Sequence, residues 1–394
     1  MKKKVHVLLI LTGLLMTIVA FKAGHVFSEQ VLVRLYSHLK ISVLQLYAPV
    51  AGYKIIGDGE VITPMTAGIN YHFVQRGQKV QIMENQRKIG TFRYVKIVGT
   101  GQSELKIHLI APERKTRSYQ GNISLAVNDG SIRLINEIDL DTYIAGVTDA
   151  ESGTRCSSEY YKVQAILART FALAHINKHI SEGFNLCDLV HCQAYHGKPR
   201  DQNIVAAVSE TRGLVVVDQN LDLIVAAFHS NSGGQTANSE DVCGGQSSYL
   251  RSIIDTFSTG LPNYSWERRM PADDWLSYLK LKHSFPVETD SGKNTALSFT
   301  QDTRKTHIEY KNIKVPLKNV RQDLHLRSTF FNVSPLGRDS VLLSGRGYGH
   351  GLGMCQEGAM LMARKGYTYL DILNYYYQNI QLIDLEKLSF FRDE

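Results

Sequence analysis

The sequence lacks several features that would assign it directly to a function class. It contains no internal repeats, no low-complexity segment and no dense run of Lys and Arg with interleaved aromatic residues. A nucleic-acid site is therefore not predicted. Hydrophobic residues make up 43% and charged residues 21% of the chain, which is typical of folded globular proteins and excludes disordered and fibrous classes.

Acidic residues are slightly outnumbered by basic ones. The 44 Lys and Arg residues against 37 Asp and Glu residues give a formal net charge of +7, and three of the positive charges are the lysines at positions 2–4. This mildly basic balance favours an anionic polymer or a membrane surface as a partner.

Cysteine is scarce and its number is odd. The five residues are Cys156, Cys187, Cys192, Cys243 and Cys355. A chain of 394 residues does not need disulfides to be stable, and an odd number leaves one thiol without a partner in the chain. We therefore expect at least one cysteine to be free or bound to a metal.

The N-terminus combines a basic cluster with an apolar run. "MKKKVHVLLILTGLLMTIVAFKAG" has the layout of a secretory signal, without a small-x-small cleavage site or a cysteine for lipid attachment. The run is close to the lower limit of about 17 residues for a membrane-spanning helix. Residues 1–29 are predicted to be a signal peptide or an N-terminal membrane anchor. The rest of the chain is then exported, to the periplasm or the extracytoplasmic face of the membrane.

The patterns along the chain predict an α+β fold. Residues 30–134 show short alternating runs such as "KISVLQLY" and "ELKIHLIA", separated by Asp-Gly turns, and predict a β-rich N-terminal region. Residues 135–385 are predicted to form a mixed α/β catalytic core, in which apolar residues from Tyr160 to Ala174 recur at helical spacing. Ser157 or Ser158 is a candidate cap for this long helix. "RGLVVVDQNLDLIVAAFHS" predicts a hairpin, residues 259–340 an insertion of mixed type, and the C-terminus a helix and a final strand.

A glycine-rich stretch near the C-terminus, "GRGYGHGLGMCQEGA", holds His350. It lacks the Lys-Ser/Thr pair of a P-loop and the βαβ setting of a dinucleotide site. The glycines are expected to let the backbone pass close to another group while holding His350. A tight turn with His350 hydrogen-bonded internally is the alternative.

A second cluster, "NLCDLVHCQAYHG", brings Cys187, His191 and Cys192 within six residues of one another. Thiolate and imidazole are the ligands that zinc prefers, so these three residues are candidate metal ligands. His175 and His179, expected one helical turn apart on the preceding helix, are candidates for a fourth ligand. A local disulfide or buried thiols are the alternatives.

Two further segments carry residues that could take part in chemistry. His229 ends an apolar strand and is followed by the polar loop "SNSGGQTANSEDVCGG", which has no Gly-x-Ser-x-Gly elbow. Such a loop suits a hydroxyl-rich ligand, or it is structural. Glu151, in "TDAESG" ahead of the long helix, would on spacing alone be interpreted as a solvated carboxylate.

Taken in order, these segments resemble the stage II sporulation protein D family, which includes the amidase-enhancer proteins. The resemblance covers residues 135 to about 380 and is weakest over 259–340. The stretches that carry it are "DLDTYIAGVTDAESG", "YKVQAILARTFAL", "CDLVHCQAY", "ETRGLVVV", "AFHSNSGGQTANSEDVCGG", "YLRSI" and "GRGYGHGLGMCQEGAMLMA". Family members often follow the glutamate at position 151 with Met-Pro, where this chain has Ser152 and Gly153.

The resemblance implies a lytic transglycosylase that cleaves the glycan strands of peptidoglycan, preferably strands stripped of stem peptides. It implies Glu151 as a single general acid and base, because the substrate's own hydroxyl closes an anhydro-muramic ring and no second carboxylate is needed. It also implies zinc bound by Cys187, His191 and Cys192. The candidates for positioning the sugar are Tyr195, His229, Ser232 and His350.

Two other functions remain open at this point. One is a non-catalytic, wall-binding enhancer of a partner amidase, with the β-rich region as its docking surface. The other is a zinc hydrolase built on Cys187, His191 and Cys192, although two thiolates make the metal a weaker Lewis acid.

Overall fold

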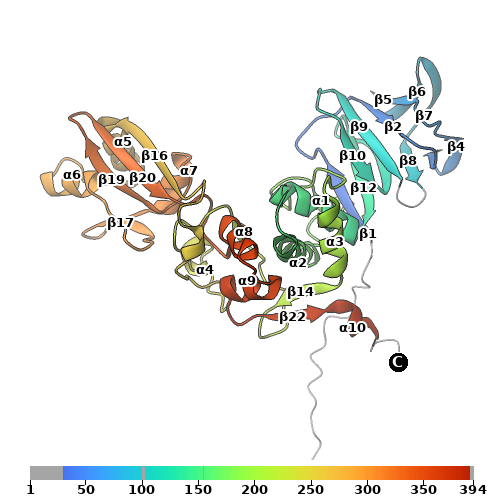
Figure 1. Cartoon of the computed structure of the whole chain (residues 1–394). Helices are drawn as coiled ribbons and strands as arrows, with labels where there is room; N and C mark the ends of the chain where they lie inside the picture. Colours follow the sequence, from blue (N-terminus) through green and yellow to red (C-terminus); the bar gives the residue numbers. More distant parts are fainter. Residues whose placement is uncertain (1–29, 100–102, 154, 391–394) are drawn as a thin grey trace, which may run out of the picture.

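The computed structural model describes residues 30–99, 103–153 and 155–390 of the chain. Three regions follow one another across the molecule: a β-rich region, a largely helical centre and a mixed insertion (Figure 1). The α+β class predicted from the sequence is confirmed. The signal or anchor predicted for residues 1–29 lies outside the described residues. Within the described ranges, no helix is both long and apolar enough to cross a membrane.

The β-rich region consists of two mainly antiparallel sheets. Alternate residues are buried along the strands, as in β9 and β12, because each sheet turns one face to a shared core. One sheet has the order β13-β1-β12-β11-β8-β3-β4 and the other β10-β9-β2-β5-β6-β7. The strands are β1 (Gln30–Leu35), β2 (Val43–Tyr47), β3 (Tyr53–Gly57), β4 (Glu60–Pro64), β5 (Asn70–Arg76), β6 (Lys79–Glu84), β7 (Arg87–Phe92), β8 (Tyr94–Gly99), β9 (Glu104–Ala111), β10 (Arg117–Gln120), β11 (Asn122–Asn128), β12 (Ser131–Asp139) and β13 (Leu186–Cys187).

The β-rich region and the helical centre are joined more closely than the boundary expected at residue 134 suggests. β12 continues to Asp139, whose side chain accepts a hydrogen bond from the Thr142 N–H and caps the next helix. β13, from the centre of the chain, pairs in parallel with β1 at the edge of the first sheet. The two regions therefore share a sheet and a continuous hydrophobic core.

The helical centre is built around the long helix predicted from the sequence. α2 (Ser158–Ala174) packs on its neighbours through a mostly buried surface. Ser157 stands at its N-cap, but its side chain makes no capping hydrogen bond. The remaining helices of the centre are α1 (Leu140–Ser152), η1 (Ile180–Glu182), α3 (Gln202–Glu210), α4 (Ser239–Val242), η2 (Thr256–Ser258), α8 (Gln356–Arg364), α9 (Tyr369–Tyr376) and α10 (Leu385–Phe390).

The hairpin predicted for residues 212–230 is wrong in its second half. β14 (Leu214–Val217) pairs with β22 (Gln381–Asp384) from the end of the chain, and only an isolated bridge joins Val217 to Leu223. The apolar segment that follows instead leads into β15 (Phe228–His229), which pairs in parallel with β21 (Met354–Cys355). Two distant segments are thereby brought together beside α8.

The insertion forms a separate hydrophobic core. A three-stranded sheet with the order β16-β20-β19 packs against helices around the buried Trp275. Its elements are β16 (Ser265–Pro271), α5 (Ala272–His283), α6 (Asp290–Leu297), β17 (His307–Tyr310), β18 (Ile313–Pro316), α7 (Leu317–Asp323), β19 (Phe331–Leu336) and β20 (Ser340–Arg346). In Figure 1 it lies at the opposite end of the molecule from the β-rich region.

Candidate active site

Glu151 lies ahead of the long helix, as the sequence indicated, but in the last turn of α1 and not at a helix entry. Its carboxyl oxygen Oε1 accepts a hydrogen bond of 3.2 Å from the Ala194 N–H. Its backbone carbonyl accepts one of 3.3 Å from the side-chain amide of Gln356, the first residue of α8. Among the described residues, nothing hydrogen-bonds to Oε2, so this oxygen is available to carry a proton.

The surroundings of Glu151 favour its protonated form. Burial is the main cause that raises the pKa of this carboxyl, and the Ala194 N–H opposes it. A helix C-terminus also disfavours a negative charge. No carboxylate of the described chain contributes to the shift. Glu151 is therefore a single, partly desolvated acid rather than one of a pair.

The glycine-rich stretch runs beside β15 and enters α8 through β21. Gly353 has a φ of +67°, and a Cβ at this position would lie 2.0 Å from the Ala227 carbonyl oxygen. A Cβ on Gly349 would lie 2.7 Å from the Cβ of His229. Glycine is needed here because the two backbone segments approach too closely for any side chain. The group that this backbone was expected to approach is therefore another segment of the same chain, around Ala227 and His229.

His229 and His350 lie together, with ring centroids 5.6 Å apart. His229 shares its Nδ1 proton with the Leu352 carbonyl at 3.1 Å, and its Nε2 has no partner among the described atoms. His350 accepts from the Leu352 N–H at 3.0 Å and donates to the Phe228 carbonyl. Burial, followed by nearby arginine charges, lowers the pKa of His350 to about 4, so both rings are neutral near neutral pH.

Ser232 is fully buried and supports the loop from beneath. Its hydroxyl donates to the carboxylate of Asp255 at 2.7 Å and lies 2.8 Å from the Ser258 hydroxyl. Tyr376 donates to the same carboxylate at 3.2 Å. In this position Ser232 orders the loop that follows His229, and its hydroxyl does not face solvent.

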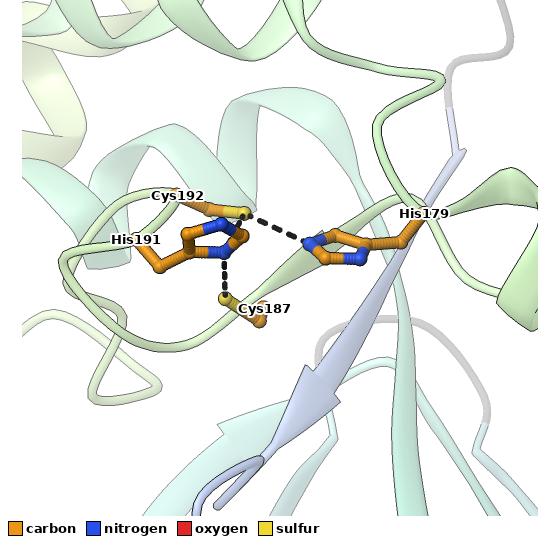
Figure 2. A group of neighbouring side chains, drawn as sticks. All are labelled: His179, Cys187, His191 and Cys192. Atoms are coloured by element: carbon orange, nitrogen blue, oxygen red, sulfur yellow. Dashed lines mark hydrogen bonds between the residues drawn. The ribbon is translucent and has the colours of Figure 1, made fainter.

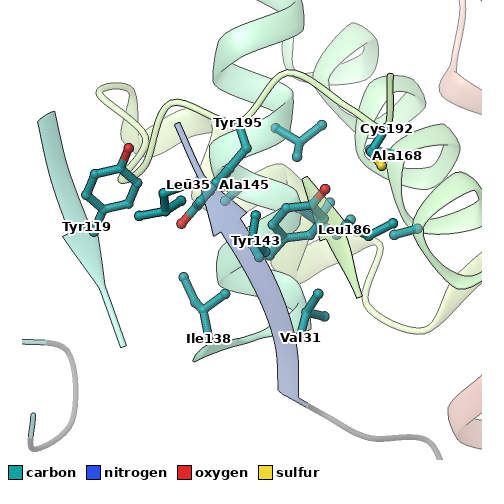
Figure 3. Close-up of a cluster of buried hydrophobic side chains, with 14 of the residues drawn as sticks. Val31, Leu35, Tyr119, Ile138, Tyr143, Ala145, Ala168, Leu186, Cys192 and Tyr195 are labelled. Atoms are coloured by element: carbon teal, nitrogen blue, oxygen red, sulfur yellow. The ribbon is translucent and has the colours of Figure 1, made fainter. Parts of the chain in front are cut away.

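Tyr195 is also fully buried, between β1 and α1 (Figure 3). Its hydroxyl donates to the side-chain oxygen of Asn136 at 2.9 Å, and its ring packs 5.1 Å from that of Tyr143. Because the side chain is buried, Tyr195 does not lie where it could contact a sugar directly. Tyr195 instead anchors the segment that presents the Ala194 N–H to Glu151.

A compact His/Cys cluster stands at the edge of the same segment. His179, Cys187, His191 and Cys192 each offer one ligand atom, and these atoms all lie within 4.8 Å of one another (Figure 2). The Cys192 sulfur lies 3.5 Å from Nε2 of His179 and 3.9 Å from Nδ1 of His191, and the Cys187 sulfur lies 3.7 Å from the same Nδ1. Tetrahedral zinc, with Zn–S about 2.3 Å and Zn–N about 2.0–2.1 Å, places its ligand atoms roughly 3.3–3.8 Å apart. Both the donor set and the spacing therefore fit zinc.

The surroundings of the cluster orient its members. Glu182 accepts from Nδ1 of His179 at 2.6 Å, as carboxylates often do beside metal-binding histidines. All five cysteines are free, so no disulfide joins Cys187 to Cys192. A hydrogen bond from Cys192 and the neighbouring His191 lower the pKa of Cys187, which favours a thiolate. His175, the other candidate for the fourth ligand, bonds instead to the Phe171 carbonyl.

The cluster and Glu151 are connected through three residues of backbone. Cys192 is followed by Gln193, whose amide donates to the Ala168 carbonyl of α2, and then by Ala194. Fixing Cys192 therefore fixes the N–H that contacts the carboxyl of Glu151. Ala194 and Gln356 were not identified from the sequence, because their contribution depends on backbone position and on a contact across 205 residues.

Comparisons with known proteins agree with this arrangement. A family model described as stage II sporulation protein matches residues 128–217, a range that includes Glu151 and the cluster. The chain is 28% identical to stage II sporulation protein D of Bacillus subtilis over 280 residues, covering 67% of this chain and 80% of the relative. An uncharacterised protein of Brachyspira hyodysenteriae is 26% identical over 280 residues, covering 69% of this chain and 74% of the relative.

The similarity extends to a second kind of protein. The amidase enhancer of Bacillus subtilis is 26% identical over 289 residues, which cover 61% of this chain and 40% of that relative. The family resemblance read from the ordered motifs is thus confirmed. The chain is thus similar to stage II sporulation protein D and to the amidase enhancer, and the match to the family model lies in residues 128–217.

Proposed function

We propose that this protein is a lytic transglycosylase that cleaves the glycan strands of peptidoglycan, with a preference for strands that have lost their stem peptides. The observation that carries the proposal is the state of Glu151: a partly buried carboxyl group with a raised pKa and no carboxylate partner. An ordinary glycosidase needs two carboxyl groups, whereas this reaction needs only one. The similarity to stage II sporulation protein D supports the same reaction.

The proposed reaction uses Glu151 twice. Its proton passes from Oε2 to the glycosidic oxygen as the bond from that oxygen to the muramic C1 breaks. The primary hydroxyl of the same muramic residue then bonds to C1 and gives its proton to the Glu151 carboxylate, which restores the acid. No water is consumed, and the product ends in an anhydro-muramic ring. The Ala194 N–H steadies Oε1 while the carboxylate is charged.

We also propose that zinc binds to His179, Cys187, His191 and Cys192 in a structural role. The four protein ligands support a closed site, because catalytic zinc sites usually keep one position for water or substrate. This argues against the zinc hydrolase considered from the sequence. When bound, the metal would hold the loop in place, and the loop holds the Ala194 N–H on Glu151.

The substrate places the proposed activity outside the cytoplasm, at the cell wall. Export through the segment at residues 1–29 would bring the chain there, with or without a retained membrane anchor. A second candidate function, stimulation of a cell-wall amidase without catalysis, is favoured by the relative named amidase enhancer. The two functions differ in whether the protein itself cleaves the glycan strands.

Product analysis tests the proposed reaction. Denuded glycan strands incubated with the protein are expected to yield fragments with anhydro-muramic ends, identified by mass spectrometry. Reducing ends would mean hydrolysis and a second catalytic group. Intact strands with a folded protein, together with a faster partner amidase, would favour the enhancer function instead.

The pH dependence of cleavage follows from the raised pKa of Glu151. The acid form is required first, so kcat/KM is expected to be highest below that pKa and to fall about tenfold for each pH unit above it. Because the folded-state pKa is raised, the stability contributed by the protonated carboxyl is lost as pH rises through it. Thermal melts over the same pH range control for unfolding. A rate that increases with pH through this range would mean that the ionised form acts first.

A further inference from the structure

Four arginines gather where the insertion meets the glycine-rich stretch, and none of them has an acidic partner. Among the described residues, no ion pair is formed by Arg304, Arg321, Arg327 or Arg346. Burial is the main cause that lowers the pKa values of His229 and His350, and the charges of Arg304 and Arg321 lower both further. A concentration of unpaired positive charge beside a proposed active site calls for an anionic ligand.

Two of the arginines are structural. The guanidinium groups of Arg304 and Arg346 lie over Phe330, at 4.9 and 4.0 Å from the ring centroid. Arg304 donates to the backbone carbonyls of Ser232 at 2.7 Å and Gln235 at 2.6 Å, and so fastens the insertion to the loop after His229. Arg304 donates through all three of its side-chain nitrogens, and Arg346 donates through Nη2 to the carbonyls of Gln301 and Asp302, so both guanidinium groups are tied to the protein.

The other two arginines have donors to spare. Arg321, on α7, uses only its Nε, which donates to the Arg327 carbonyl at 3.3 Å. The exposed Arg327 makes no side-chain hydrogen bond in the described chain, and its guanidinium lies 5.5 Å from the ring centroid of Tyr348. Partial burial lowers the pKa of Arg321, the direction expected for a cation without a counter-ion.

Tyr348 provides an exposed aromatic face on a rigid backbone. It is 45% exposed, although its backbone is hydrogen-bonded on both sides. Its N–H donates to the Asn231 carbonyl at 2.8 Å, and its own carbonyl accepts from the Asn231 N–H at 3.1 Å. The next residue, Gly349, donates to the Arg327 carbonyl at 2.9 Å. The ring is therefore held in place beside the two free guanidinium groups.

This group connects to Glu151 through a short chain of contacts. The side-chain amide of Asn231 donates to the carboxylate of Glu357 at 2.7 Å. Glu357 follows Gln356, whose amide contacts the Glu151 carbonyl. Asn231, Glu357 and Gln356 therefore link the loop of Tyr348 to the end of α1 that carries Glu151.

We propose that Tyr348, Arg321 and Arg327 form a subsite for an acidic sugar, and that they bind the free lactyl carboxylate of a muramic residue without a stem peptide. The inference rests on the proposed function. The tyrosine ring offers a flat apolar face for the sugar, and guanidinium groups bind carboxylates with paired, charge-assisted hydrogen bonds. A stem peptide joined through an amide removes this charge and adds bulk at the same atom. The subsite thereby gives a physical reason for a preference for denuded strands.

Binding of two matched substrates tests the inference. Denuded strands and the same strands with their lactyl carboxyls converted to amides are compared by calorimetry, with the full chain carrying Glu151→Gln to prevent turnover. Removing the substrate charge is expected to weaken binding about tenfold or more, as is adding Arg321→Gln or Arg327→Gln. The arginine variants are expected to bind amidated strands as the parent does. Arg338→Gln, at an exposed position in the turn between β19 and β20, is the matched control and is expected to change neither affinity.

If the chain carrying only Glu151→Gln bound denuded and amidated strands with equal affinity, the inference would be overturned. Arginine variants that lose affinity for both substrates alike would also overturn it. Because binding is read without cleavage, this outcome is distinct from a failure of the proposed reaction, which would appear as missing anhydro-muramic ends. Charge-dependent binding without such ends would count against the reaction alone.

Discussion

Glu151→Gln is expected to lower kcat for glycan cleavage by about 10²–10⁴-fold, the range that a well-placed general acid and base contributes. Glutamine keeps the size of the side chain and can still accept from the Ala194 N–H, but it cannot give a proton to the leaving oxygen. Because the neutral side chain resembles the protonated glutamate, the fold is expected to be unchanged or slightly more stable. The measurement is the release of anhydro-muramic ends from denuded strands over time.

Glu210→Gln is the matched control for this substitution. Glu210 lies at the end of α3 in the same region and pairs only with Lys162 at the surface. Surface ion pairs contribute little to stability, so activity and melting temperature are expected to stay close to those of the native chain. If Glu151→Gln kept activity similar to that of Glu210→Gln, Glu151 would not be the acid.

Loss of the metal cluster is expected to have the largest effect on stability. With zinc bound as proposed, Cys192→Ser or treatment with a strong chelator would remove the metal bonds that hold together a loop otherwise short of regular structure. The free energy of unfolding is expected to fall by several kcal/mol. Since each kcal/mol corresponds to about 2–4 °C in a domain of this size, the melting temperature would fall by roughly 10 °C. Cleavage is expected to fall as well, since Ala194 follows the cluster by two residues. Metal content by mass spectrometry and melts by calorimetry provide the readout.

Cys243→Ser provides the comparison. Cys243 is exposed and lies outside the cluster. Its substitution is therefore expected to leave zinc content and melting temperature unchanged. A native protein that contains no stoichiometric metal, and whose melting temperature a chelator does not alter, would show that these four residues hold the loop by hydrogen bonds alone.

The general architecture could be predicted from sequence because its signals are local. Alternation along β9 and β12 and helical spacing along α2 reflect which face of each element is buried. α1 was not recognised, because its residues from Tyr143 to Asp149 are all buried and show no amphipathic pattern. The failed hairpin has a related cause: β14 finds its partner in β22 at the far end of the chain, which no local pattern encodes.

In the candidate site, the sequence indicates residue types but not the directions in which side chains point. Glu151 and the Cys/His cluster have distinctive chemistry, so they could be chosen as candidates before their geometry was known. The roles expected for Tyr195 and Ser232 depended on which way each side chain points, and both point into the core. Conversely, Arg321, Arg327 and Tyr348 attract no attention in sequence, since their interest lies in the absence of nearby acids in three dimensions.

The two ends of the insertion lie side by side: the Gly347 N–H donates to the Tyr264 carbonyl at 2.7 Å, and β16 and β20 pair from Ser265 and Arg346 onward. An inserted segment whose ends touch, and which has its own core, can be lengthened, shortened or exchanged while the surrounding fold stays intact. Glu151 and the metal cluster lie outside this segment, whereas Arg321 and Arg327 lie within it. Under the proposed function, exchange of this one segment would change which sugar is bound at the proposed subsite and would leave Glu151 in place.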